Sequence, residues 1–348
     1  MGVWDATCLR QLYQAPIKQW PAPFIDPEVS WTEWSVPPPV NNAQTWSAEN
    51  TGKAQLVHDN AQPAIVQLGT MLFFDQRLSK NETISCASCH RPDRAFTDGK
   101  SLAVGEDGLM GRRRSPPLFS APFAPMLFWD GRAESLQAQV VQPIEDVREM
   151  NHSVEGVIAR LQNETFYRDA FDRAYGSDAI TTERLARALA AYVSTIRPPE
   201  TSFDEFLKGN TQALNDDQLL GLHLFRTQAR CINCHNGGLL TDNQFHNMGL
   251  SFLGRRNQDL GRYEVTRNPD DIGKFRTPSL RQVSNAGPWM HNGLFPNLEG
   301  LLRLYNAGMP PNPAPTDTGL TSPKSTLLKP LSLTPEEIKA LAAFLQTL

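Results

Sequence analysis

The sequence lacks an apolar run long enough to cross a membrane, and it has no surplus of basic residues. Its 348 residues include 33 Lys and Arg against 37 Asp and Glu, which gives a formal net charge of −4. This balance argues against a nucleic-acid partner and provides no basic face for anionic lipids. No segment approaches the roughly 20 apolar residues of a transmembrane helix, so no membrane span is expected. A small neutral substrate or a protein partner fits better.

Cysteine is also scarce, and its spacing excludes a disulfide framework. Four of the five cysteines stand in two similar five-residue words, CASCH at 86–90 and CINCH at 231–235. Such pairs are spaced to hold one group together rather than to bridge distant parts of a chain. The fifth, Cys8, is interpreted as a surface thiol, with an attachment point for a partner or a lipid as the alternative.

An internal repeat surrounds the two cysteine words. The segment LGTMLFFDQRLSKNETISCASCH (68–90) parallels LLGLHLFRTQARCINCH (219–235), and ALAAYVSTI (188–196) parallels ALAAFLQTL (340–348). Repeated segments in the same order indicate repeated structural units. Two similar lobes are therefore expected, each opening on a cysteine word and closing on a helix.

The expected organisation is an extension followed by two domains. A Pro- and Trp-rich N-terminal extension covers residues 1–50, a first domain covers 51–200 and a second covers 201–348, with the junction at 197–212. The extension is expected to be irregular and to pack on the surface, anchored by its tryptophans. A role of some of these tryptophans in electron transfer is the alternative.

Helical patterns dominate the two domains, so the fold class is predicted to be all-α with long ordered loops. One apolar stripe recurs at helical spacing at Leu185, Leu189, Tyr192, Val193 and Ile196. A second helix is expected to begin after Thr334, with Pro335 at its first position and Glu337 closing a capping box. Its buried face is predicted to consist of Ile338, Leu341 and Leu345. The Gly- and Pro-rich stretches 98–128 and 250–296 are expected to be loops that wrap a large cofactor.

The C-x-x-C-H pattern of both words is the attachment signature of c-type haem. Two thiols add across the two vinyl groups of one porphyrin, and the adjacent histidine reaches the iron. Cys86 and Cys89 with His90, and Cys231 and Cys234 with His235, are thus predicted to bind two covalent haems. Such attachment takes place outside the cytoplasm, so a periplasmic location is expected. The first twenty residues have neither the basic nor the apolar segment of a secretion signal, so a natural leader is expected to have been removed.

The task of a haem depends on the ligand opposite the proximal histidine. A strong sixth ligand favours electron transfer, and an open position favours oxygen or peroxide chemistry. No histidine lies between His90 and His152, where a loop would cover the first haem. Met110 and Met126 are candidate soft ligands in that interval. The first haem is therefore predicted to be five-coordinate or bound by water, with Met110 as the alternative ligand.

At this point the residues resemble the bacterial dihaem cytochrome c peroxidase superfamily. The resemblance covers about residues 60–348 and rests on the two haem words, on FWDGRAESLQAQVVQPIEDVREM (128–150) and on FRTPSLRQVSNAGPWMHNGLFPNLEGLLRLY (275–305). It implies two cytochrome c-like lobes, each with one haem, and reactivity with hydrogen peroxide.

Within the superfamily, the chain looks like the MauG-like branch. Ordinary peroxidases carry a methionine on the second haem and a removable histidine over the first, whereas MauG-like proteins carry a tyrosine and no such histidine. Tyr305 stands at the ligand position here, which implies iron ligation by His235 and Tyr305. Met309 is the rival ligand, and Met248 and Met290 are weaker rivals.

The same resemblance implies a peroxide site and a path between the haems. Glu149 matches the family's distal carboxylate, and Gln139 and Pro143 match its neighbours over the first iron. A carboxylate there can move a proton from the inner to the outer peroxide oxygen. Trp129 matches the tryptophan between the haems that passes charge, and His291 matches a structural position near the second haem.

Two departures from the family pattern limit the resemblance. The family's calcium ion is held by an asparagine and two backbone carbonyls; here the asparagine position is Arg114, and the carbonyls would belong to Ala286 and Pro288. An arginine cannot ligate calcium, which argues against the ion. MauG also draws electrons through a surface tryptophan before its second haem word, where this chain has Ala229, so the methylamine dehydrogenase precursor is not the expected substrate.

These observations favour a periplasmic dihaem enzyme that reacts with hydrogen peroxide and oxidises side chains, tryptophan above all, of a partner protein. In MauG-like proteins, a subset of such partners is copper-associated. Two alternatives remain: removal of peroxide with a small cytochrome or cupredoxin as electron donor, and a non-enzymatic dihaem electron carrier.

Overall fold

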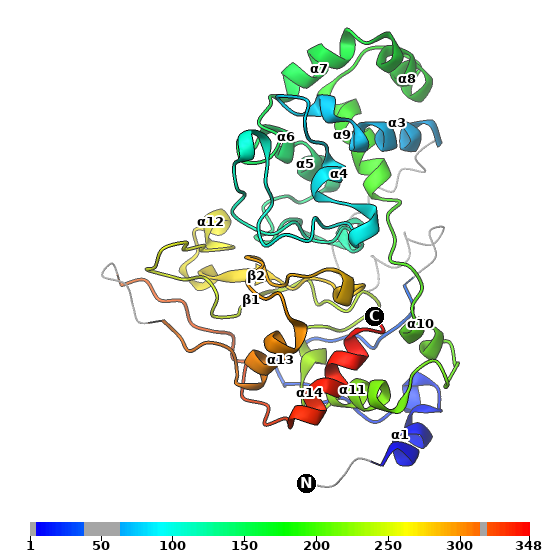
Figure 1. Ribbon diagram of the computed structural model, residues 1–348, viewed down its shortest axis with the longest axis vertical. Coiled ribbons are helices and arrows are strands. Elements are labelled where there is room, and N and C mark those ends of the chain that lie inside the picture. Colours follow the sequence, from blue (N-terminus) through cyan, green and yellow to red (C-terminus); the bar gives the residue numbers. More distant parts are fainter. Residues whose placement is uncertain (1–4, 38–62, 314–318) are drawn as a thin grey trace.

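The computed structural model describes residues 5–37, 63–313 and 319–348. Helices dominate these residues (Figure 1), and the only strands among them form one short antiparallel pair, in which His246 lies opposite Phe275. The helical class is thus confirmed, and the division into cytochrome c-like domains stays a prediction. The helices and strands are α1 (Ala6–Tyr13), α3 (Pro63–Phe74), α4 (Cys86–Cys89), α5 (Leu136–Val140), α6 (Gln142–Glu145), α7 (Val154–Gln162), α8 (Thr165–Tyr175), α9 (Thr182–Val193), α10 (Ser202–Leu207), α11 (Asp216–Arg226), β1 (Phe245–Asn247), α12 (Tyr263–Thr266), β2 (Lys274–Arg276), α13 (Leu298–Asn306) and α14 (Pro335–Leu345).

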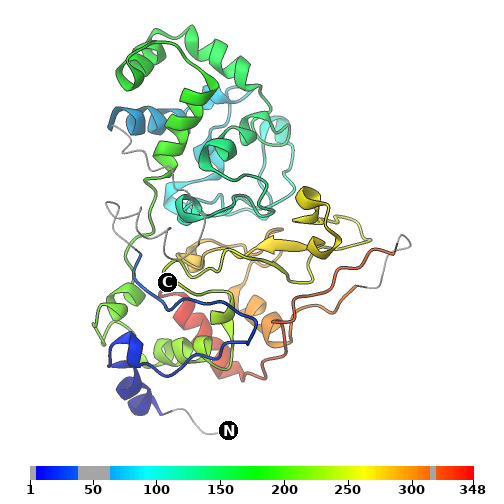
Figure 2. The ribbon, with the colours of Figure 1, turned by 180° about the vertical axis from the view of Figure 1, so that it is seen from behind.

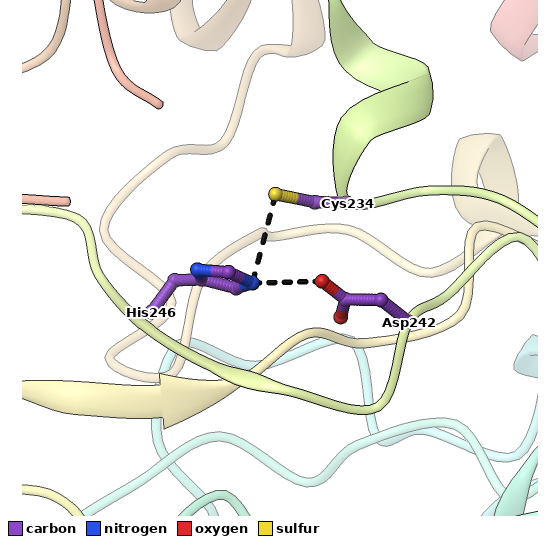
Figure 3. A group of neighbouring side chains, drawn as sticks. All are labelled: Cys234, Asp242 and His246. Carbon is purple, nitrogen blue, oxygen red and sulfur yellow. Dashed lines mark hydrogen bonds and ion pairs between the residues drawn. The ribbon is translucent and has the colours of Figure 1, made fainter. Parts of the chain in front are cut away.

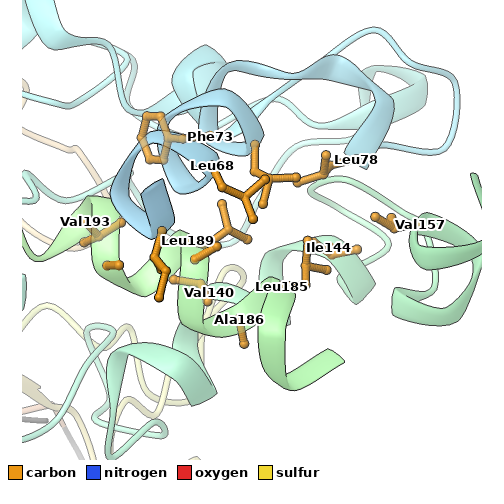
Figure 4. Close-up of a cluster of buried hydrophobic side chains, with 14 of the residues drawn as sticks. Leu68, Phe73, Leu78, Val140, Ile144, Val157, Leu185, Ala186, Leu189 and Val193 are labelled. Atoms are coloured by element: carbon orange, nitrogen blue, oxygen red, sulfur yellow. The ribbon is translucent and has the colours of Figure 1, made fainter. Parts of the chain in front are cut away.

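The upper part of the molecule in Figure 1 is built on the pair α3 and α9. Leu68 and Leu185 are each at most 1 % exposed and belong to one apolar core with residues of α5, α7 and α8 (Figure 4). The two helices cross very closely at Gly69, where a Cβ atom would stand 1.9 Å from the carbonyl oxygen of Ala188. Only glycine allows this approach without a shift of the backbone.

The lower part repeats this arrangement with α11 and α14. A Cβ atom on Gly221 would stand 2.0 Å from the carbonyl oxygen of Ala340. Gly69 and Gly221 are separated by the same number of residues as Ala188 and Ala340. In each part, the helix that leads to a cysteine word therefore crosses the closing helix at a glycine, which confirms the internal repeat.

The predicted start of the closing helix is also confirmed. The Thr334 hydroxyl accepts a hydrogen bond from the Glu337 amide, and the Glu337 carboxylate accepts one from the Thr334 amide, with Pro335 at the first helical position. The predicted apolar face, Ile338, Leu341 and Leu345, is buried. The helix stripe 185–196 is buried except for half-buried Tyr192.

The N-terminal segment contains a helix that the expected irregular extension lacks, whereas the expected anchoring by buried tryptophans is confirmed for Trp20 and Trp34. The described segment begins with helix α1, and Trp20 and Trp34 are buried in the same core as α11 and α14. Large aromatic side chains contribute much apolar area per residue, so this segment is part of the lower core. Trp4 and Trp46, also expected to anchor the extension, lie outside the described residues.

The two parts meet at the level of the β1–β2 pair, as both ribbon views show (Figures 1 and 2). Arg113 from the upper part forms ion pairs with Asp259 of the lower part at 2.7 Å and with Asp130 at 2.6 Å. The stretch expected as the junction contains α10, whose Phe203 and Phe206 lie in the lower core. Among the described helices, none is both long and apolar enough to span a bilayer.

Candidate functional site

The two C-x-x-C-H words present their histidines in the same way. His90 Nδ1 lies 2.9 Å from the carbonyl oxygen of Phe96, and His235 Nδ1 lies 3.0 Å from that of Leu240. A carbonyl oxygen can only accept, so each Nδ1 carries the proton and each Nε2 keeps a free lone pair. Burial lowers the pKa of both imidazoles and favours the neutral form. Both residues therefore fit the role of an iron ligand oriented by a backbone carbonyl.

A cavity of about 340 Å³ lies against His90. Four residues predicted for the peroxide site line it together: Trp129, Gln139, Pro143 and Glu149. Among the described residues that line this cavity, His90 is the only histidine and none is a methionine. Met110, the alternative sixth ligand, is 57 % exposed and does not line it. This arrangement supports an open position opposite His90.

The carboxyl group of Glu149 is tuned by its surroundings. Burial, with the nearby charge of Asp146, raises the pKa of Glu149 to about 7, and Arg132 opposes this effect. A carboxyl group with a pKa near neutral pH can both accept and return a proton. Glu149 thus has the chemistry of an acid–base group on the wall of the first cavity.

The backbone around Glu149 is fixed by a second loop. The amide of Glu106 donates to the carbonyl oxygen of Glu149 at 2.8 Å, and the Lys80 amide donates to that of Met150 at 2.9 Å. A Cβ atom on Gly105 would stand 2.4 Å from the same Glu149 oxygen. The buried Glu106 carboxylate accepts bonds from Asn81 and Thr83, just before the first cysteine word. The haem word and the distal carboxylate are therefore held by one loop, which the sequence analysis missed.

A second cavity, of about 190 Å³, lies against His235. Tyr305, in the last turn of α13, lines it, as do Met248 and Met290. Burial raises the pKa of Tyr305 well above its ordinary value. The strongest rival, Met309, is buried elsewhere: α13 ends at Asn306, and Met309 follows in a left-handed turn outside the lining of the cavity. Met309 is three residues beyond the end of α13, so it does not continue the face of the helix that carries Tyr305.

Four residues line both cavities and separate them: Arg114, Pro117, Trp129 and Arg276. The Trp129 indole donates to the carbonyl oxygen of Arg114 at 2.9 Å, and the ring is 7 % exposed. The His291 ring stacks on Phe275 with centroids 3.5 Å apart, and burial lowers its pKa to about 3. Trp129 is thus placed between the sites, and His291 is a neutral packing residue beside the second.

The charged residues of the second cavity suit a dicarboxylate cofactor. Its described lining includes Arg114, Arg230, Arg276 and Lys329 and no Asp or Glu. Arg276 hydrogen-bonds to a neutral partner, Asn243 Oδ1, at 3.1 Å, and burial lowers its pKa to about 10. A buried cation with neutral partners favours an anion nearby, and a haem brings two propionates.

The residues at the family's calcium position do not fit a calcium ion. The Arg114 guanidinium donates a hydrogen bond to the carbonyl oxygen of Ala286, one of the two oxygens expected as ligands. A cation that already binds this oxygen repels a second cation at the same place. The arginine therefore occupies the position between the sites that calcium would need.

Cys234, Asp242 and His246 also lie together and could in principle hold a metal ion (Figure 3). The Cys234 sulfur, however, is one of the predicted attachment points for haem. Burial disfavours charge on His246, but its 2.8 Å hydrogen bond to Asp242 and the contact with Cys234 raise its pKa to about 10. His246 is therefore hydrogen-bonded to a carboxylate beside the second haem word. The sequence analysis missed it, although His246 is the only histidine between His235 and His291.

Comparisons with known proteins agree with this geometry. The family described as di-haem cytochrome c peroxidase matches residues 63–212. A methylamine utilization protein MauG from Methylorubrum extorquens is 36 % identical over 291 residues, which are 82 % of this chain and 78 % of that protein. A cytochrome-c peroxidase IdrP1 from Pseudomonas sp. is 33 % identical over 320 residues, with 83 % and 82 % covered. A solved structure of a MauG-like protein associated with microbial copper homeostasis is similar with a TM-score of 0.75 and 27 % identity, covering 93 % of this chain and 95 % of that one.

Proposed function

Because the chain belongs to the di-haem cytochrome c peroxidase family, we propose that it uses hydrogen peroxide to oxidise side chains of a periplasmic partner protein, tryptophan above all. The observation that carries this proposal is the asymmetry of the two cavities. Glu149 lines the cavity against His90, and Tyr305 lines the cavity against His235.

When bound, haem supplies an iron that binds peroxide in the first site and stores oxidising equivalents in the second. Glu149 takes the proton from one peroxide oxygen and returns it to the other, so that water can leave. Gln139 and Pro143 line the same wall and shape the space for peroxide. Their side chains are half-buried, which keeps the cavity restricted and connected to solvent.

Trp129 and Tyr305 have different roles after the peroxide reaction. The Trp129 indole lines both cavities and passes one oxidising equivalent from one site to the other. Tyr305, as a phenolate, supplies a hard anionic oxygen that favours oxidised iron, whereas a methionine sulfur favours reduced iron. Its burial makes the phenol hard to ionise alone, so Tyr305 would lose its proton only when its oxygen serves as a ligand of the bound haem.

The partner is proposed to be a protein, because the MauG-like relatives suggest such substrates. The structural similarity to a MauG-like protein associated with copper homeostasis favours a copper-associated periplasmic partner. The periplasmic location is proposed because c-type haem is attached outside the cytoplasm.

Removal of peroxide with a small cytochrome or cupredoxin as donor is the second candidate. The specific observation that favours it is that Met248 and Met290 also line the second cavity. Ligation by either sulfur would give the second haem the character of an electron-accepting site.

Magnetic-resonance spectra of the haem-loaded ferric protein, before and after peroxide, test the proposal. One high-spin and one low-spin haem, and an oxidised state that persists without donor, are expected. Tyr305→Phe should abolish that persistence, while Tyr263→Phe, a half-buried tyrosine outside both cavities, should not. Rapid turnover with a reduced cytochrome would favour the second candidate. Two low-spin haems that do not react with peroxide would indicate a non-enzymatic electron carrier.

A further inference from the structure

The N-terminal segment touches the second haem word directly. The Trp34 indole nitrogen donates to the carbonyl oxygen of His235 at 3.2 Å. The Gly237 amide donates to the carbonyl oxygen of Thr32 at 2.9 Å, and the Asp26 amide donates to Asn233 Oδ1 at 2.7 Å. An oxidisable indole is therefore hydrogen-bonded to the backbone of the residue that faces the second cavity.

From Trp34, aromatic side chains continue toward helix α1. The Arg226 guanidinium lies 5.1 Å from the Trp34 ring and 5.4 Å from the Trp20 ring, so it bridges the two indoles. Glu33 pairs with Arg226 at 2.6 Å, which offsets a positive charge that would otherwise make both indoles harder to oxidise. The Trp20 ring in turn lies 5.0 Å from the ring of Tyr13.

The series ends at a tyrosine paired with a base. The Tyr13 hydroxyl lies 2.8 Å from His223 Nδ1, and both residues are buried, 2 % and 7 % exposed. Burial raises the pKa of Tyr13 and lowers that of His223, so the resting pair is a neutral phenol and a neutral imidazole. A phenol that loses an electron becomes a strong acid. Buried away from water, it needs a partner such as His223 to take the proton.

We propose that Tyr13 and His223 form a redox-active pair, connected to the second haem through Trp34 and Trp20, through which oxidising equivalents leave the protein. The inference rests on the proposed function, because hydrogen peroxide must first oxidise the haems. An electron moves from the Tyr13 phenol through the indoles to the oxidised haem, and the phenolic proton moves to His223 Nδ1. A neutral phenoxyl radical and an imidazolium result.

The pair is restored when a reductant, here the partner protein, returns one electron to Tyr13. The proton then moves back from His223 to the phenol oxygen. Two such electrons, with two protons, reduce one hydrogen peroxide to two waters. Tyr13 is the last residue of α1, whose Leu12 is 47 % exposed and whose Cys8 is exposed. Helix α1 is therefore the surface at which the partner is expected to be oxidised.

Rapid freezing of the haem-loaded full chain after peroxide, without donor, followed by magnetic resonance tests the pair. A tyrosyl radical is expected, with a signal that narrows when ring-deuterated tyrosine is supplied. Tyr13→Phe keeps the ring and removes only the hydroxyl, and it should abolish the radical. Tyr175→Phe, which loses a phenolic hydrogen bond to the Arg184 carbonyl in the upper part, should leave the radical intact.

A second variant, His223→Gln, tests whether the loss of the radical in Tyr13→Phe is only a structural effect. His223→Gln leaves Tyr13 in place but removes the base, and it too should abolish the radical. Haem absorption is recorded on the same samples. Two results would show that Tyr13 and His223 are not a redox-active pair: peroxide changes the haem spectra while no tyrosyl radical forms in the wild type, or while the radical persists in Tyr13→Phe. In either case the proposed function would stand. If peroxide leaves the haem spectra unchanged, the proposed function fails, and the pair with it.

Discussion

The cavities against His90 and His235 are alike in how the histidine is held and differ in the other residues that line them. Each histidine donates from Nδ1 to a backbone carbonyl five or six residues later, at 2.9 and 3.0 Å. The cavity against His90 is also lined by the half-buried Glu149, and the cavity against His235, whose lining is more apolar, by Tyr305. The repeat therefore reproduces the half of each site that attaches and orients a haem, and it leaves the reactive half free to differ.

Glu149→Gln is expected to have the largest effect, because it changes the first cavity and leaves the second intact. The amide keeps the size of the side chain and removes its acid–base chemistry. The second-order rate of the peroxide reaction should fall by about 10²–10⁴-fold, measured by stopped-flow absorption. Tyr305→Phe should leave that first step nearly unchanged, because Tyr305 lines only the other cavity. Equal losses in both variants would mean that the two sites do not differ as described.

The pH dependence of the same step should belong to the first cavity alone. Glu149 must be ionised to take the peroxide proton, and burial raises its pKa to about 7. The rate should therefore be constant above about pH 7 and fall about tenfold per pH unit below it. The profile of Glu149→Gln should be flat. A wild-type profile that is flat from pH 5 to 8 would contradict this assignment.

A smaller effect is expected from the loop that holds Glu149. Gly105→Ala places a methyl group against the carbonyl oxygens of Arg148 and Glu149, at 2.2 and 2.4 Å. The carboxylate must shift, and the peroxide rate should fall by about 10–100-fold with the ferric spectrum of the second haem unchanged. Gly111→Ala, where the nearest atom is 3.5 Å away, is the matched control. If both variants lose rate equally, the loop has no special role.

No effect is expected from removal of divalent metal. Because Arg114 binds the Ala286 carbonyl oxygen, a chelator should leave the resting spectra and the peroxide rate of the wild type unchanged. Loss of activity on chelation, restored by calcium alone, would show that the ion binds despite the arginine. A calcium ion would then contribute to both cavities.

The sequence was sufficient where a local pattern determines the structure. The capping box at Thr334 and the stripe on α9 follow from residue spacing alone, and the two haem words locate both cavities. The placement of Met309 could not be read from helical spacing, because α13 ends at Asn306. The roles of Glu106 and Tyr13 depend on partners that are distant in sequence, whereas His246 lies only four residues from its partner Asp242. No local sequence pattern predicts such distant contacts. The roles assigned to the site residues stay predictions.

The contacts of residues 24–34 with the second haem word also make the second site depend on two distant parts of the chain. Asn233, His235 and Gly237 follow about two hundred residues after the residues that contact them. Trp20 and Trp34 have no core to enter until these two parts of the chain meet. We therefore expect residues 24–34 to be among the last parts to fold, because they cover a site that must form first.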